Sequence, residues 1–209
     1  MPIRRRILAL ACATLVALVV AVVPASAVGG NNVVVVENTT DGATLVNAST
    51  QVVPTPMDAI TSGNVAVAVN TGCTGCHSTA VAVQILIVVG FPSVFAPGNA
   101  AVAVNGGCDT CGAFAYARQH WIQTFGQPVL GGAVRQRVDE LRQQIAVTAA
   151  SILPSDGATD RSLSRDQQLD AELNALTKEL IQVVTDGLHD SGAATTVLLD
   201  RTEEATPGS

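Results

Sequence analysis

Short apolar runs flanked by asparagine and glycine recur along the first half of the chain. The run at residues 65–69 lies between Asn64 and Asn70, and the same pattern returns 35 residues later at 100–104. A weaker copy, which lacks cysteines, occupies residues 33–37. A run of β-branched and small apolar residues that ends in turn-forming residues predicts a β-strand. Because the pattern recurs at a fixed period, we expect one supersecondary unit that is used several times.

A second apolar run follows each cysteine-containing copy, at residues 79–89 and 113–125. Large and small residues alternate from Ala113 to Arg118, which is the two-residue period of a strand. We therefore expect both second runs to be strands as well. The bracketing asparagines are first of all good turn residues. The alternative is that the units stack in register and that the asparagine side chains bond one another from unit to unit.

The second half of the chain carries apolar residues at helical spacing, which predicts two amphipathic helices that pack as an antiparallel hairpin. Residues 164–167 have the form of a capping box, so we expect the second helix to begin there. Apolar stripes of this kind are usually core, although a stripe that receives a partner is the alternative. The stripes comprise Val134, Val138, Leu141, Ile145 and Ile152 in the first helix, and Leu169, Leu173, Leu176, Leu180 and Val183 in the second.

Charge divides the chain at Gly126 and Gln127. Residues 28–126 contain one arginine, no lysine and four acidic residues, whereas seven basic and thirteen acidic residues follow. The sequence therefore predicts an α+β protein in which strand repeats, stapled at C-x-x-C turns, precede a helical hairpin. We expect a β-repeat domain at 28–126, the hairpin at 127–190 and an acidic, flexible tail at 191–209.

The N-terminal 27 residues match a secretory signal peptide. Three arginines at positions 4–6 precede an apolar stretch at 7–23, and the small-residue site Ala25-Ser26-Ala27 follows. We expect cleavage after Ala27 and a secreted or cell-envelope location, with a retained membrane anchor as the alternative. After cleavage we expect no further transmembrane segment.

The net charge of the chain is −6, and loss of residues 1–27 would make it −9. Nucleic acids and anionic lipids bind clustered lysine and arginine, so we expect neither as a ligand. The partner class that this leaves is an unidentified protein or a second copy of the chain.

Four cysteines remain in the mature chain, Cys73, Cys76, Cys108 and Cys111. An even number outside the cytoplasm indicates disulfide bonds first. We favour the local pairs Cys73–Cys76 and Cys108–Cys111, because they form whatever the packing of the repeats. Pairing between the repeats is the alternative, and it requires the two turns to be neighbours.

The segment Cys73-Thr-Gly-Cys76-His77 also matches the attachment motif of c-type haem. A haem site built on Cys73, Cys76 and His77 needs a second axial ligand, usually downstream. The one mature methionine, Met57, lies upstream, and the second copy has Gly112 in place of the histidine. We therefore expect no haem and treat this cofactor as an alternative.

Two other uses of the cysteines stay open. Two C-x-x-C pairs can form a four-cysteine zinc site from Cys73, Cys76, Cys108 and Cys111, although the 31-residue spacer is longer than usual. A single C-x-x-C can also act as a thiol-redox pair, but such pairs normally sit at a helix N-terminus. We expect no bound metal and no redox activity, and keep both as alternatives.

Motifs that carry catalytic chemistry are absent from the sequence. It contains no H-E-x-x-H, no G-x-S-x-G and no phosphate-binding glycine loop. We therefore expect no catalytic residues and a non-enzymatic protein, a structural or interaction module.

The repeated N-x-A-V-A-V-N pattern, the C-x-x-C after each full copy and the charged hairpin resemble the C-terminal extracytoplasmic region of actinobacterial peptide zinc metalloprotease proteins, or a stand-alone secreted relative of that region. The resemblance covers most of residues 31–187. The protease chemistry of that family lies in a membrane portion that this sequence lacks, so the resemblance implies an envelope or secreted module without catalytic residues. His77 has no expected role in the family pattern.

Overall fold

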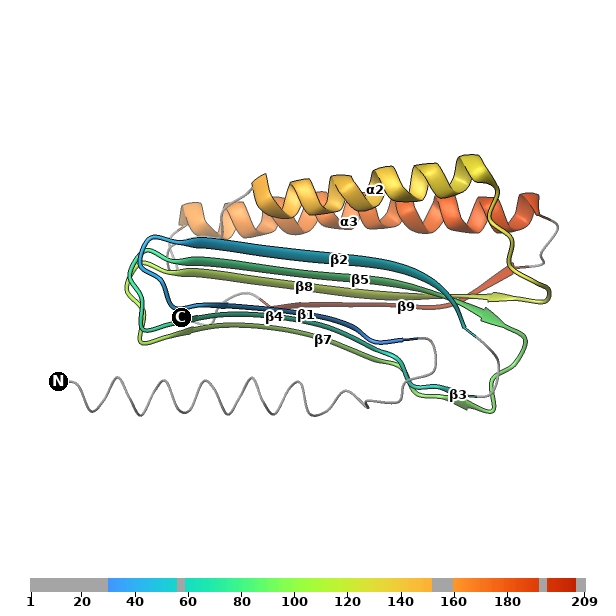
Figure 1. The fold of residues 1–209 in the computed structure, drawn as a ribbon, viewed down its shortest axis with the longest axis horizontal. Helices are drawn as coiled ribbons and strands as arrows, with labels where there is room; N and C mark the ends of the chain where they lie inside the picture. Colours follow the sequence, from blue (N-terminus) through green and yellow to red (C-terminus); the bar gives the residue numbers. More distant parts are fainter. Residues whose placement is uncertain (1–29, 56–58, 152–159, 192–194, 206–209) are drawn as a thin grey trace.

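The structure is a computed structural model that describes residues 30–55, 59–151, 160–191 and 195–205. The predicted signal peptide, residues 1–27, lies outside the described residues. The chain forms two facing β-sheets and a helical layer that covers one of them (Figure 1). It is therefore a mixed protein of parallel sheets and paired helices.

The first sheet is parallel and contains β1 (Asn32–Asn38), β4 (Gly63–Thr71) and β7 (Gly98–Gly106). The second sheet contains the parallel strands β2 (Thr44–Thr55), β5 (His77–Val89) and β8 (Gly112–Thr124), followed by the antiparallel strand β9 (Thr195–Ala205). A small sheet pairs β3 (Ala59–Ile60) with β6 (Val94–Phe95). Residues 79–89 and most of 113–125 are thus strands, as predicted.

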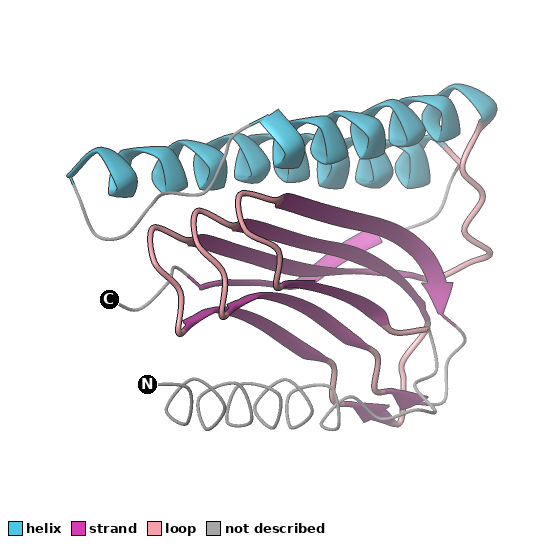
Figure 2. Cartoon of the chain, turned by 60° about the vertical axis from the view of Figure 1, so that its left-hand side comes forward, coloured by secondary structure: helices cyan, strands magenta, loops and turns pink. Residues whose placement is uncertain are grey.

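The chain winds from the first sheet through a tight turn into the second and then returns, which stacks three coils side by side (Figure 2). Strand β4 pairs with β7 so that each residue lies beside the residue 35 positions later, and β5 pairs with β8 at the same offset. The offsets to the first coil are shorter, as in Asn32 beside Asn64 and Thr44 beside His77. This winding is that of a parallel β-solenoid.

Small side chains fill the space between the two sheets. Alternation along a strand sends neighbouring side chains to opposite faces, and the alanines face inward. This inner cluster consists of Val34, Val36, Ala66, Ala68, Ala80, Ala82, Ala113, Ala115 and Ala117, with Ala101 and Ala103 packed against it. Because alanine is short, the sheets can approach closely. On the other face of the second sheet, Val81, Phe114 and Tyr116 pack against the helices, whereas Leu86, Val88 and Trp121 form a separate cluster with Ile60.

Helices α2 (Gly132–Ser151) and α3 (Asp160–Asp190) run antiparallel across the outer face of the second sheet (Figure 1). Their buried residues share one core with Val81, Phe114 and Tyr116 of the sheet. The predicted helical pair is therefore present. The helices approach closely at Gly187, where an added Cβ would lie 2.7 Å from Val134 Cγ1.

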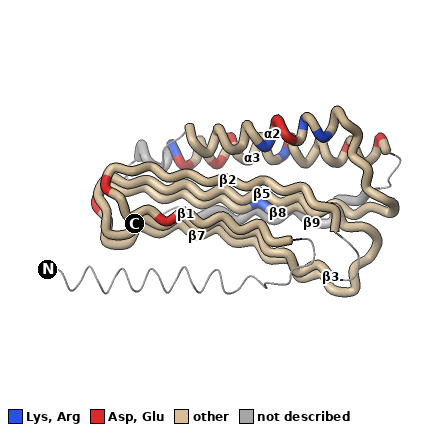
Figure 3. Tube along the Cα trace, viewed as in Figure 1, with Lys and Arg blue, Asp and Glu red and all other residues tan. Residues whose placement is uncertain are grey.

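The charged residues of the described part of the chain lie mostly on α2 and α3, whereas β1 to β8 carry few of them (Figure 3). The helices thus present a polar outer face and an apolar inner one. The part of the chain that the structure describes includes no helix with the length and apolar character needed to cross a membrane.

Two sequence-based expectations are wrong. Helix α3 begins at Asp160, so residues 164–167 lie inside the helix instead of opening it. The predicted flexible tail is also incorrect for Thr195–Ala205, because this segment pairs with β8 as β9. The free edge of β8 offers a row of backbone donors and acceptors, which a further strand can satisfy.

Candidate functional site: stacked cysteine turns

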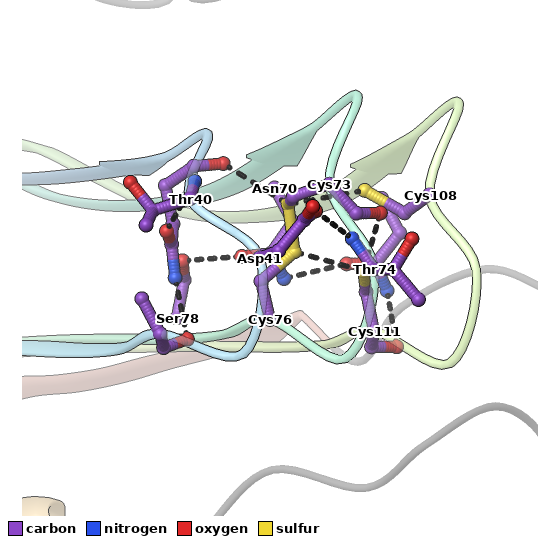
Figure 4. The surroundings of a disulfide bond; sticks show 12 residues. Thr40, Asp41, Asn70, Cys73, Thr74, Cys76, Ser78, Cys108 and Cys111 are labelled. Atoms are coloured by element: carbon purple, nitrogen blue, oxygen red, sulfur yellow. Dashed lines mark hydrogen bonds between the residues drawn. A yellow bond between two sulfur atoms is a disulfide. The ribbon is translucent and has the colours of Figure 1, made fainter.

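The cysteines lie in two turns that stack directly on one another at one end of the solenoid (Figure 4). One turn links β4 to β5 and the other links β7 to β8. Each turn contains left-handed backbone, at Gly75 (φ 62°) in the first and at Thr110 (φ 54°) in the second. Glycine adopts this conformation without steric penalty, whereas threonine does so rarely.

Backbone hydrogen bonds hold the two turns in register. The Gly75 amide donates to the Asp109 carbonyl at 2.9 Å, and the Gly112 amide donates to the Cys76 carbonyl at 3.0 Å. Thr74 and Asp109 also form an isolated parallel bridge. The ladder therefore continues through the turns, which brings the cysteines of adjacent coils together.

The four sulfur atoms form one compact cluster, all within 4.8 Å of one another. A disulfide joins Cys73 to Cys76. Between the coils, the Sγ atoms of Cys73 and Cys108 lie 3.8 Å apart, and those of Cys76 and Cys111 lie 2.9 Å apart. Cys73, Cys76 and Cys111 are buried, and Cys108 is partly buried.

The two predicted local pairs fare differently. Cys73–Cys76 is bonded as expected, but Cys108 and Cys111 are free thiols. The Cys111 sulfur faces Cys76 of the neighbouring coil at 2.9 Å, and its thiol donates to the Cys73 carbonyl at 3.4 Å. The Cys111 thiol thus lies against the neighbouring turn.

Burial raises the pKa of the Cys111 thiol to about 11, and the nearby Cys108 adds to the increase. A hydrogen bond with the Cys76 backbone opposes this shift. At neutral pH the Cys111 thiol is therefore protonated, whereas a reactive cysteine needs a lowered pKa.

An asparagine ladder ties the strand ends to the cysteine turns. The Asn70 amide nitrogen donates to Asn105 Oδ1 and to the Gly112 carbonyl, each at 2.8 Å. Asn70 Oδ1 accepts from the Ser78 hydroxyl at 2.7 Å. In the first coil, Asn38 donates instead to the carbonyls of its own turn and of the next coil, at Ala43 and His77.

A second asparagine ladder crosses the other ends of the same strands. Asn32 donates to Asn64 Oδ1 at 2.9 Å, and Asn64 donates to Asn99 Oδ1 at 2.7 Å. All three side chains are buried. Each amide can donate and accept at once, so the buried ladder links the three coils through side-chain hydrogen bonds.

Glutamines form a third ladder that the sequence analysis missed. Gln119 donates to Gln84 Oε1 at 2.7 Å, and Gln84 donates to Gln51 Oε1 at 3.4 Å. The signal was available in the sequence, because Gln84 and Gln119 are 35 residues apart. In β-strand sequences a buried glutamine at a fixed period indicates such a ladder.

The residues of the haem alternative, Cys73, Cys76 and His77, lie at the start of β5 and in the turn before it. His77 begins β5 and is partly buried, and it is not among the side chains of the four-sulfur cluster. Cys73 and Cys76 are bonded to each other on a turn between strands, which leaves neither thiol for haem attachment. His120 lies within β8 and His189 near the end of α3, so the histidines occupy separate elements.

A surface hollow of about 450 Å³ lies on the helical layer, away from the cysteines. Its lining is Glu140, Gln143, Gln144, Val147, Thr148 and Leu176. The Glu140 carboxylate is held by Arg137 at 3.0 Å. No pair of titratable groups in this lining offers acid–base chemistry.

Comparison with protein-family models, with curated proteins and with solved structures finds no match to this chain.

Proposed function

We propose that the chain is a non-catalytic structural or interaction module of the secreted or cell-envelope space. The observation behind the proposal is that the buried polar side chains of the chain bond to one another between adjacent coils. Asn64, Asn70 and Gln119 bond to the same residue type in the adjacent coil instead of facing a hollow. Polar side chains used in this way specify the stacking of the scaffold and hold no substrate.

In this proposal each coil is one repeat unit, and the bracketing asparagines are the shared residues that connect the units. Repeat modules of this kind gain stability from their nearest-neighbour interfaces. An alanine-filled interior contributes little burial per residue, so the ladders and the cysteine cluster supplement it. In this proposal the repeat unit is therefore stabilised by its polar ladders more than by a large apolar core.

The location follows from the N-terminal 27 residues and from cysteine use. A signal peptide leads to an oxidising space in which disulfides persist. The chain would then be a stand-alone relative of the extracytoplasmic region that it resembles. Its partner would be a protein or a second copy, since the mature chain is acidic.

Two measurements test this proposal. The chain is expressed with its own N-terminus in an actinobacterial host, and the exported protein should begin at Val28 and carry no covalent group. Removing the Asn70 amide leaves several buried partners unsatisfied, so Asn70→Ala should lower the free energy of unfolding by about 3 kcal/mol. The matched control Asn47→Ala, at an exposed position of β2, should change it by less than about 0.5 kcal/mol.

Either of two results would contradict the proposal. One is a mass increase of about 600 Da in the exported protein, which indicates covalent haem. The other is equal stability of Asn70→Ala and Asn47→Ala, because the ladder would then contribute nothing to the scaffold.

A further inference from the structure

We propose that the four cysteines bind one zinc ion when the Cys73–Cys76 disulfide is reduced, so that the oxidation state of the cluster selects between a covalent bridge and a metal. The ligands would be the thiolates of Cys73, Cys76, Cys108 and Cys111. The ligand class is a thiophilic divalent cation that accepts tetrahedral sulfur coordination, of which Zn²⁺ is the common example in proteins.

The sulfur positions are close to those of a tetrahedral site. A Zn–S distance of about 2.3 Å sets neighbouring sulfurs about 3.8 Å apart in a regular tetrahedron. The Cys73 and Cys108 sulfurs already lie 3.8 Å apart. The Cys76 and Cys111 sulfurs, now at 2.9 Å, would separate by about 1 Å. The Cys73 and Cys76 sulfurs, now bonded to each other, would separate after reduction. All four already lie within 4.8 Å of one another, so the shifts required are local to the two turns.

The solenoid explains how such a distant pair of C-x-x-C segments can share one ion. The 31-residue spacer is not a loose loop but one coil of the solenoid, which returns the second turn to the position beside the first. Backbone bonds at Gly75 and Gly112 fix the two turns relative to each other. These backbone hydrogen bonds thus fix the positions of the two turns in the absence of metal.

Burial favours the metal over free thiolates. Four thiolates whose sulfur atoms lie within 4.8 Å of one another in a shielded turn would repel one another. A divalent ion supplies the opposite charge and allows all four sulfurs to lose their protons. Structural zinc sites with four cysteines are closed to water in this way.

The change from disulfide to zinc site requires a two-electron reductant. A dithiol or phosphine supplies two electrons, the Cys73–Cys76 bond breaks, and the two sulfurs take up two protons. The dithiol becomes a disulfide, or the phosphine becomes its oxide with oxygen from water. One Zn²⁺ then replaces the four thiol protons, which pass to solvent, and four Zn–S bonds form.

This inference is independent of the proposed function. The proposed scaffold function depends on the side-chain ladders, and Asn70→Ala tests these ladders in the oxidised protein. The metal site is tested in the reduced protein with the metal itself, so one can fail while the other holds.

The test uses the purified mature chain without oxygen. After phosphine reduction and removal of the reductant, Co²⁺ is added as a spectroscopic probe and then displaced by Zn²⁺. We expect the intense visible absorption of tetrahedral thiolate-bound cobalt at one equivalent per chain, its loss on adding zinc, and one zinc per chain by elemental analysis. The unreduced protein should bind less than a tenth of an equivalent.

Variants assign the ligands. Cys111→Ser should weaken zinc binding at least 100-fold, whereas the matched control His77→Ala should leave it unchanged. Circular dichroism verifies that each reduced variant is folded. Three results would overturn the proposal: no thiolate–cobalt absorption from the folded, reduced wild type, equal zinc binding by the unreduced protein, or dependence on His77 instead of Cys111.

Discussion

Asparagine suits the interior of this molecule because its amide can donate to one neighbour and accept from another. Asn64 donates to Asn99 and to the Ala82 carbonyl, and accepts from Asn32. A buried group satisfied on both sides avoids the desolvation penalty of an unpaired one. Serine or threonine could not span adjacent coils in the same way, since a hydroxyl has one donor and is shorter.

Tyr116 joins the sheet to the helices and gives the protein a pH dependence. Its hydroxyl donates to Asn174 Oδ1 at 3.1 Å, and Arg118 donates to the same oxygen at 2.7 Å. Burial raises the Tyr116 pKa above its usual value near 10, although Thr177 and Arg118 oppose the shift. The folded protein therefore holds this proton more tightly than the unfolded chain does.

We predict that the stabilisation linked to this proton is fully present below pH 10 or so and is lost as the pH rises through the folded-state pKa. Tyr116→Phe should lower stability by about 1 kcal/mol at neutral pH and should flatten the decline above pH 10. Because the chain contains a single tyrosine, tyrosinate absorbance follows this residue alone. A titration midpoint at or below 10 in the folded protein would contradict the prediction.

At the scale of elements, the helices show which parts of the sequence pattern were reliable. Val138, Leu141 and Ile145 are buried as predicted. In α3 the heptad drifts, so that Val184 is buried where Val183 was expected, because an ideal helix has 3.6 and not 3.5 residues per turn. The capping box failed because a local four-residue signal does not determine where tertiary packing lets a helix begin.

Substitutions at Leu141 and Leu176 can show whether the apolar stripe of the helices is part of the core or a surface for a partner. Leu141 is fully buried in the shared core, whereas Leu176 only packs against it. Leu141→Asp should lower the free energy of unfolding by about 4 kcal/mol or more, since it buries an unpaired charge. Leu176→Asp should have a smaller effect.

The matched control is Val147→Asp on α2, where the side chain is 60% exposed. It should change stability by less than about 0.5 kcal/mol. Chemical denaturation followed by far-ultraviolet circular dichroism measures all three variants. Equal stability of the Leu141 and Val147 variants would show that the stripe is not core and would favour a partner surface.

At the scale of the whole molecule, the local elements could be predicted from the sequence, whereas the contacts between coils could not. Strand positions and the helical pair follow from local periodicity. The four-sulfur cluster depends on the two turns being stacked in register, which the spacing of 31 residues between C-x-x-C pairs does not show by itself. Strand β9 was missed because Asp200, Glu203 and Glu204 follow its short apolar run and made the whole segment resemble an acidic tail, and because its pairing with β8 is long-range.

The pairing of β9 gives the last prediction. Strand β8 is buried at every position and lies between β5 and β9. Deleting residues 191–209 should leave its edge unpaired along the ten register pairs from Ala115 to Thr124. An open edge of this kind invites pairing with another chain, so the truncated protein should show a lower melting temperature and form dimers or aggregates in light scattering after size exclusion. Removal of residues 206–209 alone is the matched control and should change neither property.

Hydrogen exchange gives the direct measure, because the β8 amides that face β9 should lose protection only in the longer deletion. Unchanged protection there, with a monomeric and equally stable protein, would show that β9 does not hold this edge.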